Sequence, residues 1–319
     1  MTSPREPCTE WWQALRADPL GWLLDERHPN VAWRVLVDLV ERPAEAPAVC
    51  RMRGGASATE PVASLLERLL PDGTWECGVP AWSPFQGAWW RLIAAVRLGA
   101  DPTDPRLRAG LQRLLEEGDG LHVADPCARA RAVEAACRLG WGDHPVVAEE
   151  LARFEAGAHG GWTCVHEAHH DGEGRCTVTA VALARAVAST ERPDRELGEA
   201  AASRIAAWLG GLDHPLETGL AGGFPNLMRT DRLEALTALV MAGHPWDGGL
   251  HPALAAVQLA QDAEGRWRLD AGPEAFGHLE GWEREDRPSR WLTLAALVVL
   301  KAWAVPAGLP NVLGPPPAA

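Results

Sequence analysis

The sequence lacks the features that mark membrane proteins and nucleic-acid-binding proteins. No apolar run in its 319 residues reaches the ~18 to 20 residues that a membrane span needs. The start, Met1 to Thr9, lacks the basic and then apolar layout of a signal peptide. Lys301 is the one lysine among 30 lysines and arginines, and no basic block offsets the formal net charge of −13. We therefore expect a cytoplasmic protein with no membrane span and no nucleic-acid partner.

The cysteines do not form the even set that a disulfide framework requires. There are seven of them, and an odd count in a chain without a leader is more typical of free thiols or metal ligands. Their positions are therefore the main chemical clue in the sequence.

A glycine-containing turn recurs along the chain at intervals of roughly 40 to 60 residues, which is typical of a repeat array. The copies are Asp72-Gly73-Thr74-Trp75, Asp119-Gly120-Leu121-His122, Gly160-Gly161-Trp162, Gly222-Gly223-Phe224 and Glu264-Gly265-Arg266-Trp267. Apolar residues at helical spacing fill the intervals, and no strand pattern occurs. The sequence therefore predicts an all-α protein with two helices in each repeat.

Capping residues and prolines set the predicted helix boundaries. Helices that follow a turn are predicted at about 84–98, 126–139, 230–243 and 289–304, and Cys176-Thr177 opens the corresponding helix of the third unit. Their partners are predicted at about 60–70, 104–117, 143–156, 194–210 and 250–261. Residues 9–53 are predicted to form further helices.

One turn carries the pattern Q-x-x-x-G-x-W, from Gln261 to Trp267. It resembles the QW motif of squalene cyclases, and the turns at Trp75 and Trp162 resemble degenerate copies without the glutamine. The chain thus resembles the α/α-toroid superfamily of terpenoid cyclases and protein prenyltransferases, which includes the prenyltransferase and squalene oxidase repeat proteins. The segments 160–164 and 287–294 are also similar to uncharacterised bacterial toroid-repeat proteins.

The resemblance implies a ring of inner helices wrapped by outer helices, with a ligand cavity on the axis and the Gly-Trp turns at one end. The expected organisation is an N-terminal helical extension packed on the ring (1–53), an α/α-toroid domain (54–304) and a disordered Pro-rich tail (305–319). The acidic signatures D-x-D-D and D-D-x-x-D of the cyclases are both missing. A standard cyclase mechanism therefore cannot be transferred to this chain.

Cysteines and histidines gather near the third unit. Cys127 and Cys176 each open a predicted inner helix, and Cys164 lies two residues after a turn tryptophan. With one of His166, His169 or His170, for which we choose His170, these cysteines would form a tetrahedral zinc site. The alternative is that Cys127 and Cys176 are small core residues and that the histidine-rich loop is a surface loop.

Aromatic residues on the first and last inner helices could line an apolar cavity: Trp82, Phe85, Trp89, Trp90 and Trp291. At helical spacing, however, such residues are more often packing residues. Asp231 is our candidate general acid or base, since it follows Thr230 at the cavity end. The ordinary interpretation is that Asp231 has no catalytic role and is simply a carboxylate in the first turn of a helix.

Three hypotheses for the function remain open. The first is an enzyme of the cyclase and prenyltransferase type that acts on an apolar, isoprenoid-like small molecule with the help of zinc. The second is a non-catalytic toroid that binds a lipid, peptide or protein and uses the Cys/His cluster as a structural clamp. The third is a zinc-dependent enzyme that modifies a peptide. A coordination position open to a deep pocket favours an enzyme, and a closed four-ligand site away from the pocket favours the clamp.

Overall fold

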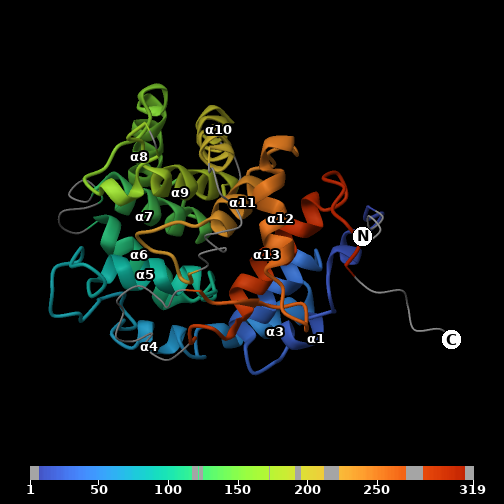
Figure 1. The fold of residues 1–319 in the computed structure, drawn as a ribbon. Helices are drawn as coiled ribbons and strands as arrows, with labels where there is room; N and C mark the ends of the chain where they lie inside the picture. The colour runs from blue at the N-terminus through green and yellow to red at the C-terminus, as the bar shows by residue number, and fades with distance from the viewer. Residues whose placement is uncertain are drawn as a thin grey trace.

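Helices dominate the protein (Figure 1), as the sequence predicts. The computed structural model describes residues 7–116, 121, 125–171, 173–190, 195–211, 223–270 and 283–312. Within these ranges, the named strands are β1 (Trp267–Arg268) and β2 (Pro288–Ser289), which pair antiparallel. The predicted turn at 119–122 falls largely outside the described residues, as does Gly222. The all-α prediction is confirmed.

The helices that follow the turns match the predicted series. They are α5 (Ala88–Arg97), α7 (Pro126–Arg138), α9 (Thr177–Ala188), α11 (Arg232–Met241) and α13 (Arg290–Trp303). Their partners are α4 (Val62–Leu66), α6 (Pro105–Glu116), α8 (Pro145–Ala156), α10 (Arg195–Gly210) and α12 (His251–Leu259). The chain opens with η1 (Trp11–Ala14), α1 (Leu20–Leu23), α2 (Pro29–Arg34), its π-helical continuation η2 (Val35–Leu39) and α3 (Pro47–Ala56). Short 3-10 turns are η3 (Ala158–Gly160), η4 (Glu167–His169) and η5 (Gly248–Leu250).

Local capping explains why these helices begin where they do. The carboxylate of Asp231 accepts a hydrogen bond from the Glu234 amide at 2.8 Å, and the Ser289 hydroxyl accepts one from the Leu292 amide at 3.2 Å. Pro126 occupies the first position of α7, where its missing amide proton costs nothing. The helices therefore begin at residues that cap a helix N-terminus or favour its first turn, as the sequence predicts.

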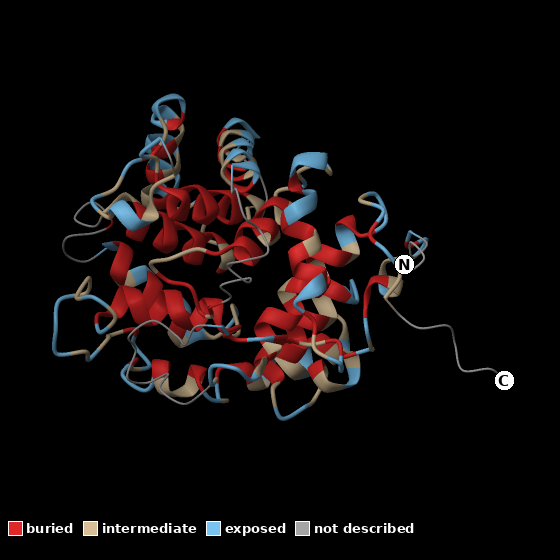
Figure 2. Cartoon of the chain, viewed as in Figure 1, coloured by how far each residue is buried: buried red, intermediate tan, exposed pale blue. Residues whose placement is uncertain are grey.

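Each post-turn helix packs on the next one. The contacts run from α5 to α7, from α7 to α9, from α9 to α11 and from α11 to α13, and α13 also contacts η2. The indole of Trp33 in α2 donates at 2.8 Å to the carbonyl of Gly99, just after the end of α5, and this bond links α2 to the turn that follows α5. Buried residues concentrate on these helices, whereas α8 and α10 carry much of the exposed surface (Figure 2).

The turn tryptophans make equivalent contacts in two repeats. The Trp162 indole donates to the Phe154 carbonyl at 2.9 Å, and the Trp267 indole donates to the Val257 carbonyl at 2.7 Å. Each bond ties a turn to the last part of the preceding helix, α8 or α12. The amide of Gln261 donates to the Ala14 carbonyl at 2.9 Å. The Q-x-x-x-G-x-W turn thus joins the last repeat to the start of the chain.

The structure corrects the expected boundaries at both ends. The division at residue 53 falls inside α3, and Arg34 and Asp38 on α2 and η2 line the same cavity as the later helices. Residues 305–312, expected in a disordered tail, pack against the N-terminal segment. Leu309 is fully buried, and its carbonyl accepts from the Cys8 amide at 2.7 Å. Residues 313–319 lie outside the described residues.

Of the helices in the described ranges, none combines the length and the apolar character needed to cross a membrane.

Candidate functional site

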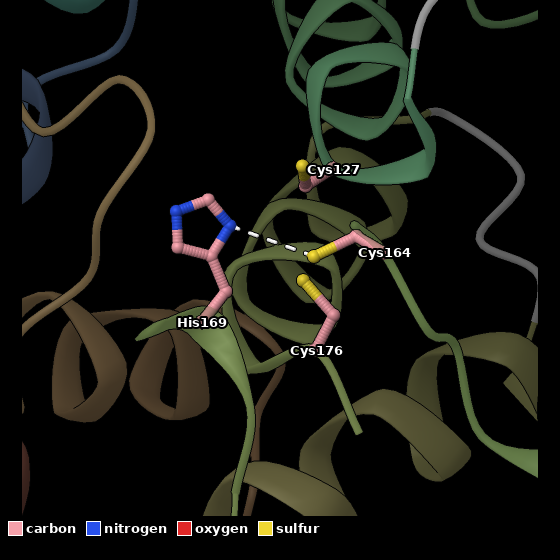
Figure 3. A group of neighbouring side chains, drawn as sticks. All are labelled: Cys127, Cys164, His169 and Cys176. Atoms are coloured by element: carbon pink, nitrogen blue, oxygen red, sulfur yellow. Dashed lines mark hydrogen bonds between the residues drawn. The ribbon is translucent and has the colours of Figure 1, made fainter. Parts of the chain in front are cut away.

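Three cysteines and a histidine converge where α7 and α9 begin (Figure 3). One ligand atom from each of Cys127, Cys164, His169 and Cys176 lies within 4.8 Å of all the others. The Sγ atom of Cys164 is 3.6 Å from Nδ1 of His169. The predicted convergence of the three cysteines is therefore confirmed.

Helix starts and loop bonds hold these side chains in place. Cys127 follows Pro126 in the first turn of α7, and Cys176 is the N-cap of α9, where its sulfur accepts from the Thr179 amide at 3.4 Å. The Thr177 hydroxyl donates to the His169 carbonyl at 2.9 Å, which fastens the histidine loop to α9. Cys127 and Cys176 are fully buried. The scaffold thus presents sulfur from two helix starts and one loop.

The loop before Cys176 has the same geometry as the turn before Trp267. In the cysteine loop the Asp171 carboxylate accepts from the amides of Glu173 and Arg175, both at 2.9 Å. In the tryptophan turn Asp262 accepts from the amides of Glu264 at 3.0 Å and Arg266 at 2.9 Å. The two turns thus share one local geometry, while Cys176 itself caps α9 as Ser289 caps α13.

The geometry of the cluster is compatible with zinc. With Zn–S near 2.3 Å and Zn–N near 2.0 to 2.1 Å, a tetrahedron separates two sulfurs by about 3.8 Å and a sulfur from a nitrogen by about 3.6 Å. The Cys164–His169 distance of 3.6 Å agrees with this value, and the other separations stay within 4.8 Å. Three cysteines and one histidine form a ligand set that zinc uses in closed structural sites. The cluster could therefore hold a metal ion, and its chemistry suits zinc.

Hydrogen bonds inside the cluster favour one thiolate. The bond from Cys127 lowers the pKa of Cys176 to about 3, with further help from His169 and Thr179. The same contact, followed by burial, raises the pKa of Cys127. Burial raises the pKa of Cys164 to about 11. One sulfur is thus ready to bind a cation, and metal binding would release protons from the other two.

The histidine in the cluster differs from the one chosen from the sequence. His170 Nε2 lies 2.9 Å from the Cys164 carbonyl oxygen and 3.6 Å from Cys164 Sγ, but the four-membered set contains His169 instead. His166 turns toward Asp125, with 3.5 Å between Nε2 and the carboxylate. The spacing of three histidines in five residues does not reveal which ring faces the sulfurs.

A separate cavity of about 290 Å³ lies between the helices. Its lining comes from α2, η2, α5, α7, α9, α11 and α13 and from the segment that precedes α11. The cavity includes two residues chosen from the sequence, Asp231 and Trp291, and Trp291 stacks on Phe224 with ring centroids 5.0 Å apart. None of the four cluster residues lines it. Met228, close in sequence to Phe224, packs against the cysteines.

The other four predicted ligand-binding aromatics pack against one another outside this lining. Trp82 stacks on Trp89 with ring centroids 5.1 Å apart, and Phe85 lies 5.4 Å from Trp90. Trp89 and Trp90 are buried. The contacts of these four aromatic residues are therefore those of packing residues rather than of residues that line the cavity.

A buried network of charges forms one wall of the cavity. Glu134 accepts from Arg185 at 2.7 Å and from Arg131 at 3.2 Å. Glu234 accepts from Arg131 at 2.8 Å and from Arg97 at 2.5 Å. These bonds connect α5, α7, α9 and α11 through charged side chains. The network satisfies both carboxylates, as burial of charge requires.

Asp231 differs from the two glutamates because no arginine pairs with it in the described structure. Its Oδ2 accepts from the Asn226 amide at 2.6 Å and from the Gly223 backbone at 3.2 Å. Burial, followed by the negative charge of Glu234, raises the pKa of Asp231 to about 6. A buried carboxyl group in a cavity with such a pKa can exchange a proton near neutral pH.

Sequence reasoning missed four arginines that line the cavity: Arg34, Arg97, Arg138 and Arg185. A signal was present for two of them. The tripeptide Arg-Leu-Gly ends both α5 and α7, at 97–99 and 138–140. Aligning the repeats on this tripeptide would have placed both arginines at equivalent positions.

Comparison with protein-family models finds no match for this chain, and comparison with curated proteins finds none either.

Proposed function

We propose that the protein is an α/α toroid that binds a small, largely apolar molecule in its axial cavity and is held together by a structural zinc ion. The sequential packing of α5, α7, α9, α11 and α13 supports a ring, and the contact of α13 with η2 supports its closure. The likeness of the QW turns to those of terpenoid cyclases and prenyltransferases supports the same superfamily. The cavity corresponds to the axis of such a ring.

One observation carries the proposal. Four protein ligands surround the metal position, two of them fully buried cysteines, and none of the four lines the cavity. A catalytic zinc usually has three protein ligands and an open position, whereas a Cys₃His set is closed. The metal is therefore a clamp between α7, α9 and their loop, and ligand binding belongs to the cavity. A zinc-bound thiol or peptide substrate finds no coordination position here.

A second candidate function is acid–base catalysis on the bound molecule. Asp231 favours it, because this carboxyl group lines the cavity, is buried and forms no ion pair within the described residues. In this role Asp231 would give or take one proton at Oδ1 or Oδ2, next to the Phe224–Trp291 stack. A cyclisation or isomerisation of an apolar substrate would need such a group.

The proposal is tested by binding and by metal removal together. We expect 1-octanol, a neutral apolar probe, to bind the zinc-loaded protein in calorimetric titration. Val298→Trp, which fills the cavity, should abolish binding, whereas the exposed control Val305→Trp should not. Removal of zinc should lower the melting temperature. Octanol binding that survives Val298→Trp, or a melting temperature unchanged by metal removal, would contradict the proposal.

A further inference from the structure

The charges around the cavity do not balance. The negative groups of the wall and its network are Asp38, Glu134, Asp231 and Glu234, and the positive groups are Arg34, Arg97, Arg131, Arg138 and Arg185. Five guanidinium groups thus face four carboxylates. Because most of these groups are buried, water screens the extra positive charge poorly.

Arg138 is the most weakly paired of the five arginines. Its nearest carboxylate is Glu134 at 3.7 Å, and no hydrogen bond to its guanidinium is found in the part of the chain that the structure describes. Its side chain is 10% exposed, and it contributes to the lining of the cavity. Burial lowers the pKa of Arg138 well below its usual value, and the positive charges of Arg34 and Arg185 lower it further. A bound anion would therefore reduce the electrostatic repulsion among Arg34, Arg138 and Arg185.

The nearby carboxylates already form ion pairs or hydrogen bonds with groups other than Arg138. Arg34 pairs with Asp38 at 2.7 Å, Arg185 with Glu134 at 2.7 Å and Arg97 with Glu234 at 2.5 Å. Asp231 is held by Asn226, by the Gly223 amide and by the Glu234 amide at the start of α11. An anion placed at Arg138 therefore meets a guanidinium whose one recorded carboxylate contact, to Glu134, is the long one of 3.7 Å.

The other side of the cavity is apolar. The Phe224–Trp291 stack and Leu294, Val298 and Val240 contribute to its lining. The volume of about 290 Å³ is close to the lower end of the ~300 to 1,000 Å³ usual for ligand pockets. The cavity thus has one cationic side and one apolar side within a small space.

We infer that the ligand of this cavity is a small amphiphilic anion, whose carboxylate or phosphate head group binds Arg138 and whose apolar body packs on the Phe224–Trp291 stack. The inference rests on the proposed function and specifies its ligand class. Carboxylate and phosphate share the oxygen pair that a guanidinium binds in bidentate geometry. Arg138 acts as the specificity determinant, because a neutral apolar molecule leaves its charge uncompensated.

The test compares octyl phosphate, octanoate and 1-octanol by calorimetric titration of the zinc-loaded full chain. We expect at least one anion to bind roughly 10-fold or more tightly than octanol, as for a hydrogen bond to a charged group. Arg138→Met should remove this preference, so that the anions no longer bind more tightly than octanol. Arg195→Met, at an exposed arginine on α10, is the matched control and should keep the preference.

The outcomes separate the two proposals. If octanol binds as tightly as both anions, the inference is wrong and the proposed function stands. If none of the probes binds, both are wrong. A preference for the anions that persists in Arg138→Met also overturns the inference. If Arg138→Met does not fold, the relative affinities of the three probes for the wild type decide the question. The anion that binds more tightly shows whether the site prefers phosphate or carboxylate.

Discussion

Replacing Glu234 with glutamine removes one of the two carboxylates that neutralise the buried arginines. Burial opposes ionisation of Glu234, but the charges of Arg131 and Arg97 outweigh it and lower its pKa from 4.5 to about 2. A difference of about 2.5 units corresponds to about 3 kcal/mol of stability at neutral pH. Removal of one partner from a buried ion pair costs a similar ~3 to 5 kcal/mol. We therefore expect Glu234→Gln to lower the free energy of unfolding by about 3 kcal/mol at pH 7.

The pH dependence follows from the direction of the shift. A carboxylate whose pKa is lowered by folding stabilises the protein above its unfolded pKa, and this contribution is lost as the pH falls from about 4.5 to 2. Urea unfolding at several pH values measures it, with the exposed Glu199→Gln as control. A loss below about 1 kcal/mol at pH 7, or one that does not shrink on acidification, would refute the account of the network.

Three further predictions concern single side chains. Trp267→Ala should lower the free energy of unfolding by about 3 to 5 kcal/mol, because Trp267 is fully buried and hydrogen-bonded. The control is Trp12→Ala, which should cost little because Trp12 is 46% exposed. Equal losses in the two variants would contradict this prediction. Asp231 has a pKa raised from 3.8 to about 6, so its contribution is most favourable below pH 3.8 and is lost as the pH rises through 6. The wild type should therefore lose about 2 to 3 kcal/mol relative to Asp231→Asn between pH 4 and 7 in urea titrations, and a constant difference would refute the shift. Cys176→Ser should weaken zinc affinity in competition with a chelator, while Cys137→Ser, a core substitution outside the cluster, should not; equal effects would indicate general damage to the core.

Local chemistry explains the part of the fold that could be predicted. The starts of α7 and α13 follow from Pro126 and Ser289, because caps and first-turn prolines act within a few residues. The convergence of Cys127 and Cys176 follows from equivalent positions in successive repeats. These features can be predicted from local sequence and from the spacing of the repeats.

The features that sequence reasoning missed depend on contacts between distant segments. Leu309 is buried because its backbone pairs with Cys8, about 300 residues earlier, and composition alone suggested a disordered tail. The ion pairs of Arg97 and Arg185 span α5, α7, α9 and α11, so helical periodicity could not show which polar residues face one another. The choice between His169 and His170 depends on side-chain direction in an irregular loop.

X-ray absorption spectroscopy of the zinc-loaded protein tests the central claim most directly. We expect one zinc per chain, with three sulfurs at about 2.3 Å and one nitrogen at about 2.0 to 2.1 Å, from Cys127, Cys164, Cys176 and His169. The sulfur count should fall from three to two in Cys164→Ser, whose side chain is the most accessible of the three cysteines. A spectrum with oxygen ligands and fewer than three sulfurs, or a protein that takes up no zinc, would contradict the structural zinc clamp.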